Sequence, residues 1–153
     1  MDVEIRRAVG ADAGDLSNLA RRAKAHWGYP PEWMRRWKAD LTLTPKYLDS
    51  RNAYVAQRDG RPIGMCVLEL HGEDATLEHV WITPEFHRQG IGRHLVVHAL
   101  DTARRAGVVA VKVVADPFAE AFYLKLGAQR IGTVPAPMPG APRRVLPLLE
   151  FAL

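Results

Sequence analysis

The sequence predicts a mixed α/β fold with a central sheet of six to seven strands and about four flanking helices. The first observation behind this prediction is a run of three apolar, β-branched segments, 52–58, 61–71 and 75–83, with turn signals between them. Asp59-Gly60 is one such signal, and strands joined by short turns of this kind pair in antiparallel fashion. The second observation is that a helical pattern and the short apolar segment 108–115 come next. A strand, a helix and a further strand form a crossover unit, so we expect 75–83 and 108–115 to lie parallel and adjacent.

The N-terminal part is predicted to contain one strand and two helices. Segment 3–8 has the pattern of a strand, and apolar residues recur at helical spacing over 10–25. Gly28 and the prolines that follow it break this helix. A second, short helix is expected over 32–41, with Pro31 near its first turn.

The C-terminal part is predicted to add a helix and a closing strand. Asp116 can cap the helix, and Gly127 suits its end. Residues 133–144 hold four of the eleven prolines and are expected to form a loop. Residues 145–151 form the closing strand, in which Pro147 would place part of the strand at an edge of the sheet.

Length and composition indicate one globular domain over residues 1–153. Of the 153 residues, 48% are hydrophobic and 25% are charged, which is ordinary for a soluble protein. No apolar run is long enough to span a membrane, and the start lacks a secretory signal pattern, so we expect a cytoplasmic protein without membrane contact. Cys66 is the only cysteine, and the histidines lack metal-ligand spacing, which argues against a disulfide or a zinc site. The net charge of +4 comes without a basic run or a stacking motif, so no nucleic-acid partner is predicted.

Two glycines lie where the strand 75–83 gives way to a helix. Gly90 and Gly92 lack Cβ atoms, so the backbone can approach a ligand closely at this point. The first N–H groups of a helix have no intrahelical partner, and the helix dipole adds positive potential beside them. Arg88 and Arg93 add formal charge, so the loop is predicted to bind phosphate.

Three common phosphate-binding motifs do not fit this loop. A dinucleotide fingerprint needs a glycine where the chain has Leu95. A P-loop needs Gly-Lys-Ser/Thr where the chain has Gly92-Arg93-His94, and a kinase loop needs a much longer chain. The glycines alone are also compatible with an ordinary tight turn before a helix.

The glycine loop resembles the acyl-CoA signature of the GNAT superfamily of N-acetyltransferases, Arg/Gln-x-x-Gly-x-Gly/Ala. His87 departs from this pattern, because the family usually has Arg or Gln there, but the loop loses no backbone donor. A second stretch resembles the last helix of the family, Asn-x-x-Ala-x-x-x-Tyr-x-x-x-Gly, with Asp116, Ala119, Tyr123 and Gly127 at the matching spacings. Asp116 replaces the Asn of the family and cannot donate a hydrogen bond when it is ionised.

The resemblance implies a single GNAT domain that moves an acetyl group directly from acetyl-CoA to an amine, with no covalent enzyme intermediate and no metal. It also implies that the strand 75–83 is splayed from its neighbour and that its main-chain groups receive the pantetheine arm and the thioester. The residues expected to bind the cofactor lie on this strand, in the glycine loop and on the last helix: Val80, Trp81, Ile82, His87, Arg88, Gln89, Gly90, Ile91, Gly92, Arg93, Asp116, Ala119 and Phe122.

Two side chains are expected to carry the proton transfers. The resemblance makes Tyr123 the acid that meets the departing thiolate, whereas core packing beside Phe122 is the alternative role for this tyrosine. Glu78 is the expected base, directly or through water, because it interrupts an apolar strand on which several family members carry a working Glu. His79 has the more suitable unperturbed pKa, but strand alternation places it opposite Glu78, so only one of the two would face the acceptor. An ion pair for Glu78 and simple burial for His79 are the structural alternatives.

The acceptor is not identified by the sequence. His26, Trp27 and Tyr29 share one loop, and their rings would suit a small amine through cation–π contact, while capping of the core is the alternative role for Trp27 and Tyr29. The loop 26–31, the helix 32–41 and the loop 133–144 should frame the same pocket, while a peptide N-terminus and an aminoglycoside-like amine stay open as acceptors. A homodimer is common in the family, with the strand near 145–153 as its contact. The alternative function is a non-catalytic acyl-CoA-binding or regulatory module of the same fold.

Overall fold

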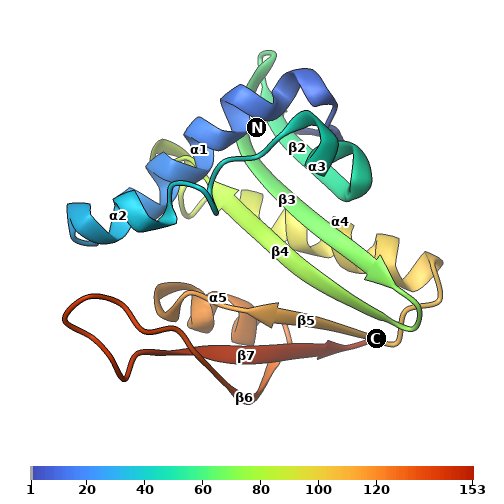
Figure 1. Ribbon diagram of the computed structural model, residues 1–153. Helices are drawn as coiled ribbons and strands as arrows, with labels where there is room; N and C mark the ends of the chain where they lie inside the picture. Colours follow the sequence, from blue (N-terminus) through green and yellow to red (C-terminus); the bar gives the residue numbers. More distant parts are fainter. Residues whose placement is uncertain (1) are drawn as a thin grey trace.

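The computed structural model describes residues 2–153, which form a seven-stranded sheet and five α-helices (Figure 1). The strands are ordered β1-β2-β3-β4-β5-β7-β6, and every neighbouring pair is antiparallel except β4 and β5. The strands are β1 (Glu4–Arg7), β2 (Asn52–Arg58), β3 (Arg61–His71), β4 (Asp74–Ile82), β5 (Ala110–Val114), β6 (Gln129–Pro135) and β7 (Val145–Ala152). The helices are α1 (Ala13–Ala25), α2 (Pro31–Trp37), α3 (Pro45–Ser50), α4 (Ile91–Arg105) and α5 (Glu120–Lys125), with short 3-10 helices over Gly10–Asp12, Pro84–Phe86 and Pro117–Ala119.

This architecture confirms the predicted fold class. The antiparallel meander is β2, β3 and β4, and the crossover through α4 makes β5 parallel to β4, as the order of the elements predicts. Within residues 2–153, no helix combines the length and the apolar character needed to cross a membrane.

Two elements were not predicted. The helix α3 begins with Thr44, whose side-chain oxygen accepts a hydrogen bond from the amide of Tyr47, and continues with Pro45 in its first turn. This Thr-Pro pair is a helix-start signal, so the sequence did contain the information. The strand β6 includes Thr133 to Pro135, so the prediction of a loop over 133–144 is wrong for its first residues.

The prediction that Pro147 places part of the last strand at a sheet edge is also wrong. β7 lies between β5 and β6, and β6 is the edge strand. Pro147 fits inside the sheet because it lies just beyond the last pair of β5 and β7, Val114 with Leu148. Its carbonyl accepts a hydrogen bond from the amide of Ala115 at 3.0 Å, and its missing N–H falls where the ladder with β5 has ended.

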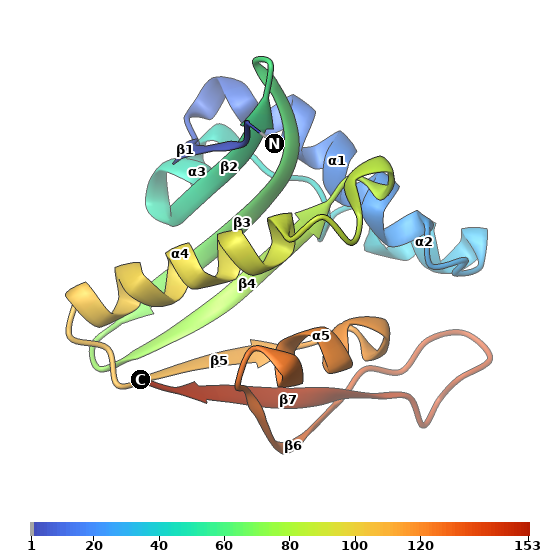
Figure 2. The same cartoon turned by 180° about the vertical axis from the view of Figure 1, so that it is seen from behind.

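Helices cover both faces of the sheet. On one face α1 and α3 bury Leu16 and Leu48 in a core that they share with Met65 of β3 (Figure 1). On the other face α4 buries Leu95 in a core that contains Cys66, and α5 lies on the same side, against β5 and β7 (Figure 2). Cys66 is therefore a buried residue of the core.

Gly64 marks a close approach of α4 to β3. A Cβ atom at this position would lie 2.8 Å from Cδ1 of Ile82 and 3.1 Å from Cδ1 of Leu95. Neither side chain can move far, because both belong to, or pack against, the core under α4.

We expect Gly64→Ala to lower the free energy of unfolding by about 1–3 kcal/mol, since an added methyl group would overpack this contact. The matched control is Gly132→Ala in β6, where a Cβ atom would meet nothing within 4 Å, and this change should leave stability nearly unaltered. Chemical denaturation measures both variants. Equal stability of the two would contradict the close packing at Gly64.

Candidate active site

The start of α4 presents free amide groups. Gly90, the residue before the helix, has a left-handed backbone with φ of 80°, a conformation that glycine adopts without steric cost. The first intrahelical hydrogen bond runs from the amide of His94 to the carbonyl of Gly90 at 3.0 Å. The amides of Ile91, Gly92 and Arg93 donate to no other group in the described part of the chain. Three adjacent free N–H groups at a helix N-terminus suit an anionic ligand.

Gly92 is needed for a different reason than Gly90. A Cβ atom at Gly92 would lie 3.2 Å from the ring of Phe122 and 3.7 Å from Ile82, whereas one at Gly90 would meet nothing within 4 Å. The first turn of α4 is therefore packed tightly against α5 and the end of β4. The anion site consequently lies beside the helix that carries Tyr123.

His87, the departure from the family pattern, ties the glycine loop to β4. Its Nε2 atom lies 3.0 Å from the carbonyl oxygen of Ile82, and its ring contacts that of His26 edge to face, with 5.2 Å between the centroids. Arg88, with φ of 61°, and Gln89 follow on the exposed side of the loop. His26 thus packs beside the glycine loop.

β4 and β5 pair over only a short stretch. Their register contains the pairs Asp74 with Ala110 and Thr76 with Lys112 at its two ends, and no pair follows among residues 2–153 (Figure 1). The β5-facing edge of β4 beyond Thr76, which includes Val80, Trp81 and Ile82, is therefore open. This opening is the splayed strand pair that the resemblance implies.

A β-bulge in β4 decides where Glu78 and His79 point. Val67 of β3 pairs with His79 and Leu68 pairs with Leu77, which leaves Glu78 as an extra residue. One extra residue reverses the alternation of side chains along a strand. The prediction that Glu78 and His79 lie on opposite faces is therefore wrong, and both line one pocket.

Glu78 is held by a hydrogen bond and an ion pair. Its Oε1 atom accepts from the hydroxyl of Tyr47 at 2.7 Å and from Nε of Arg51 at 2.8 Å. Its other oxygen, Oε2, has no partner among the described residues. Burial and the adjacent carboxylate of Glu78 raise the pKa of Tyr47, which keeps that hydroxyl protonated. Tyr47 belongs to α3, so the unpredicted helix supplies one group that orients Glu78.

His79 is held in one tautomer. Its Nδ1 atom accepts a hydrogen bond from the indole N–H of Trp81 at 2.9 Å, and an indole nitrogen can only donate. The proton of the neutral imidazole is therefore on Nε2, so neither ring nitrogen has a free lone pair. Burial lowers the pKa of His79, which favours this neutral form.

The ring of Tyr123 is buried, but its hydroxyl has no protein partner. The side chain packs between Phe122 and Phe151, with ring centroids at 5.0 and 6.4 Å. No group among the described residues forms a hydrogen bond with the hydroxyl. Among these residues, the side-chain polar atoms that are both fully buried and without a partner belong to Arg21 and Arg144, so the hydroxyl oxygen of Tyr123 is not fully buried. It is therefore open to solvent or a ligand. Burial raises the pKa of Tyr123, so the phenol is protonated at neutral pH.

Asp116 faces the acceptor side of the sheet. Its carboxylate caps the turn before α5 by accepting from the amide of Phe118, and it also accepts from the hydroxyl of Tyr29 at 2.8 Å. Lys24 lies 3.7 Å from the same carboxylate. Burial, with the adjacent Asp116, raises the pKa of Tyr29 to about 12. Asp116, which the resemblance assigns to the cofactor, therefore links the acceptor loop to the start of α5.

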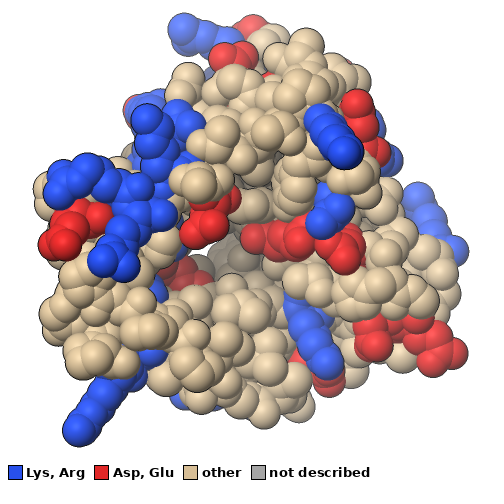
Figure 3. Space-filling view, in the orientation of Figure 1, with Lys and Arg blue, Asp and Glu red and all other residues tan. Residues whose placement is uncertain are grey.

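A pocket of about 380 Å³ opens where β4 and β5 diverge. The surface is hollowed here, with charged side chains of both signs around the opening (Figure 3). Glu78, His79, Trp81 and Asp116 line it, and none of His26, Trp27 and Tyr29 does. Residues 32–41 and 133–144, which were expected to frame the acceptor pocket, contribute Trp37, Met138 and Arg144 to its lining, whereas Lys24 of α1 is a lining residue that the sequence did not predict.

The three residues predicted to hold the acceptor do not line this pocket, and His26 packs against His87 at the glycine loop. Trp27 stacks on Phe118 with 5.7 Å between the centroids and lies 5.8 Å from Trp81. The ring of Tyr29 faces Lys24 and Arg144, each at 5.7 Å from its centroid. Lys24 and Arg144 thus make the cation–π contacts with Tyr29 that we expected the acceptor amine to make.

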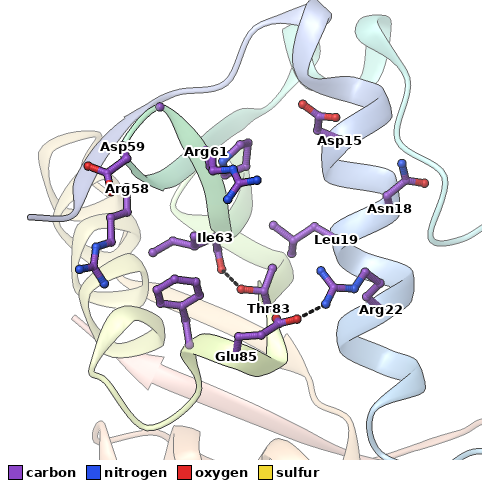
Figure 4. A pocket seen from close by; sticks show the side chains of 13 residues that line it. Asp15, Asn18, Leu19, Arg22, Arg58, Asp59, Arg61, Ile63, Thr83 and Glu85 are labelled. Atoms are coloured by element: carbon purple, nitrogen blue, oxygen red, sulfur yellow. Dashed lines mark hydrogen bonds and ion pairs between the residues drawn. The ribbon is translucent and has the colours of Figure 1, made fainter. Parts of the chain in front are cut away.

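A second pocket, of about 720 Å³, lies between α1 and the β2–β3 hairpin (Figure 4). Its wall carries an ion pair between Arg22 and Glu85 and a hydrogen bond from the hydroxyl of Thr83 to the carbonyl of Ile63. It contains neither Glu78 nor any residue of α5, so the smaller pocket is the candidate acceptor site. Among residues 2–153, no group of three or more His, Cys, Asp or Glu side chains is placed to hold a metal.

Comparison with known proteins shows similarity to acetyltransferases. Residues 15–128 match the sequence model of the acetyltransferase (GNAT) family. PaiA N-acetyltransferase from Thermoplasma acidophilum, in complex with coenzyme A, superposes with a TM-score of 0.82 at 20% identity, over 100% of both chains. A GCN5-related N-acetyltransferase from Rhodopseudomonas palustris gives 0.84 at 18% identity, over 100% of this chain and 97% of that one. The structure of yncA from Salmonella typhimurium, with its cofactor acetyl-CoA, gives 0.72 at 17% identity, over 100% and 95%. At these identities the similarity establishes a shared fold.

We expect His79 to titrate below its ordinary pKa of 6.5. Because the folded pKa is lower than the unfolded one, His79 contributes stability above about pH 6.5 that is lost as the pH falls toward the folded pKa. Nitrogen NMR should show a proton on Nε2 and none on Nδ1 at pH 7. Trp81→Phe removes the donor to Nδ1 and should raise the pKa, whereas Trp27→Phe, the control, should not. A wild-type pKa at or above 6.5 would contradict this arrangement.

Proposed function

Because the chain belongs to the acetyltransferase (GNAT) family, we propose that it binds acetyl-CoA and moves the acetyl group directly from the thioester to a primary amine. Family membership confirms the resemblance drawn from the two motifs and makes the chain an acyltransferase. The observation that carries the finer proposal is the position of the open edge of β4. It ends beside the free amides of α4 and faces the pocket that contains Glu78.

The glycine loop is the proposed site for the pyrophosphate of the cofactor. The amides of Ile91, Gly92 and Arg93 would donate to the phosphate oxygens, and the exposed side chains of Arg88 and Arg93 would add charge. The main-chain groups of residues 80–82 would hold the pantetheine arm as an added strand does. Their N–H groups would also stabilise the negative charge that develops on the thioester oxygen.

Glu78 is the proposed base. Its free Oε2 atom would take the proton of the amine, directly or through one water, while Tyr47 and Arg51 hold Oε1 in place. The amine nitrogen then forms its bond to the carbonyl carbon. His79 is the weaker candidate because Trp81 occupies Nδ1 and the proton occupies Nε2.

Tyr123 is the proposed acid. As the C–S bond breaks, the sulfur of coenzyme A becomes a thiolate, and the phenol of Tyr123 would donate its proton to it. The raised pKa keeps this proton in place until the thiolate forms. The open, unpartnered hydroxyl supports this role, since a purely structural buried tyrosine usually finds a hydrogen bond.

We expect Tyr123→Phe to lower turnover about 10²-fold while it leaves acetyl-CoA affinity and stability nearly unchanged, because the hydroxyl has no protein partner to lose. Thiol release, calorimetry and melting on one preparation measure all three. The matched control is Tyr54→Phe, whose hydroxyl lies 3.3 Å from that of Thr102. This control should lose about 1 kcal/mol of stability and keep its turnover. Full turnover in Tyr123→Phe would remove the residue from the mechanism.

We expect Glu78→Gln to lower the rate at neutral pH and to recover part of the loss as the pH rises, because the amine then loses its proton unaided. The matched control is Glu69→Gln, which removes the other carboxylate that Arg51 binds, at 2.8 Å, but lies outside the pocket. The pH profile of the control should stay that of the wild type. If His79→Ala gives the pH signature and Glu78→Gln does not, His79 is the base.

Other expectations stay predictions. They are the extent of one domain over 1–153, a cytoplasmic location and a homodimer. The proposed dimer contact at the last strand needs revision in any case, because β7 lies inside the sheet and β6 is the edge strand.

A further inference from the structure

Two cations of the acceptor pocket share one aromatic cage, formed by Tyr29, Trp33 and Trp37. The ammonium of Lys24 lies 3.8 Å from the ring centroid of Trp37 and 5.7 Å from that of Tyr29. The guanidinium of Arg144 lies 5.3 to 5.7 Å from the centroids of all three rings. Both side chains line the pocket, and they come from opposite ends of the chain.

The two cations differ in whether a carboxylate forms an ion pair with them. Lys24 has a counter-ion, the carboxylate of Asp116 at 3.7 Å. Arg144 forms no ion pair with any described residue, and its one hydrogen bond runs from Nη1 to the carbonyl of Ala136 at 3.3 Å. Its Nη2 atom has no hydrogen-bond partner among the described residues but is sealed from solvent, whereas Nε also has no partner and is not sealed, so Nε is the donor that a bound group can reach. Arg144 is half-buried and lacks a carboxylate partner, so an anionic group bound in the pocket would satisfy a donor that the protein leaves free.

The acidic side chains of the pocket do not neutralise this guanidinium. Glu78 is paired with Arg51, and Asp116 already serves Tyr29, the amide of Phe118 and Lys24. Asp40 is exposed and forms no ion pair within residues 2–153. The charge of Asp40 acts on Lys24, whereas no carboxylate of the described residues lies within ion-pair distance of Arg144.

We propose that the acceptor amine carries an anionic group, a carboxylate, which Lys24 and Arg144 receive while the amine faces Glu78. This inference rests on the proposed acetyl transfer and names the class of its acceptor: an amine of amino-acid size with both groups. A pocket of about 380 Å³ is large enough for such a molecule. The aromatic cage fixes the guanidinium in advance, so that little side-chain entropy is lost on binding.

The competing role for the cage is structural. Trp33 donates its indole N–H to the carbonyl of Pro139 at 2.9 Å, and so ties α2 to the segment between β6 and β7. If the cage only holds this segment in place, Arg144 contributes to stability and has no effect on the choice of acceptor.

The test compares amines that differ only in a carboxylate: phenylalanine with phenethylamine, methionine with 3-(methylthio)propylamine, and leucine with isopentylamine. Thiol release from acetyl-CoA gives kcat/KM, and calorimetry on the coenzyme A complex gives Kd for the same compounds. We expect the wild type to favour the amino acid of at least one pair by about tenfold or more, as for a charge-assisted hydrogen bond. Arg144→Gln and Lys24→Met should each reduce this preference, chiefly through KM.

Arg143→Gln is the matched control, because Arg143 is exposed and lies outside the pocket. It should keep the wild-type preference. Equal use of both members of every pair, or a preference that survives in Arg144→Gln while its melting temperature falls, overturns the inference. If no amine releases thiol although acetyl-CoA binds, the proposed function fails. The Kd values then test the carboxylate site on their own. Carboxylate-dependent binding that Arg144→Gln abolishes then supports the inference, and its absence overturns it.

Discussion

The pairing of β4 with β5 stops after Thr76, and the rest of the site depends on that interruption. β4 continues to Ile82 and stays paired with β3, so one of its edges keeps backbone groups without a strand partner. Such groups need water or a polar ligand, because leaving them buried and unpaired costs free energy. From the end of this edge the chain passes through the 3-10 helix Pro84–Phe86 and the glycine loop into α4, which brings free helix amides to the same place. An extended ligand with an anionic end fits both features at once.

A single extra residue in β4 brings the ionisable groups of the acceptor pocket to one face of the strand. The bulge at Glu78 places this carboxylate on the same face as His79 and Trp81, where regular alternation would have separated them. Trp81 then fixes the tautomer of His79, and α3 contributes Tyr47 to hold Glu78. These hydrogen bonds favour Glu78 over His79 as the proposed base, whereas the unperturbed pKa values alone would favour the histidine.

The aromatic residues of α2 and the preceding loop serve the protein's own charges. Tyr29, Trp33 and Trp37 surround Arg144 and approach Lys24, so the pocket wall presents cations that are already oriented. The cation–π contacts of these rings are therefore made with Lys24 and Arg144, within the protein. In our proposal, these two cations give the pocket its specificity toward the acceptor. The replacement of the family's Asn by Asp116 belongs to the same network, because its carboxylate joins Tyr29 and Lys24 to the start of α5.

Local patterns in the sequence were enough to predict the glycine loop, the spacing of the last helix and every strand and α-helix except α3 and β6, because periodicity, turn residues and helix caps act over a few neighbouring residues. The sequence also contained a signal for α3 in Thr44-Pro45. The face on which Glu78 lies follows from the three-dimensional structure, since a bulge depends on how β3 and β4 pair. The tertiary structure also placed Pro147 inside the sheet and brought Lys24 and Arg144 to one set of rings. Register and long-range convergence are set by which strands and helices pack together, and no local pattern of residues contains that information.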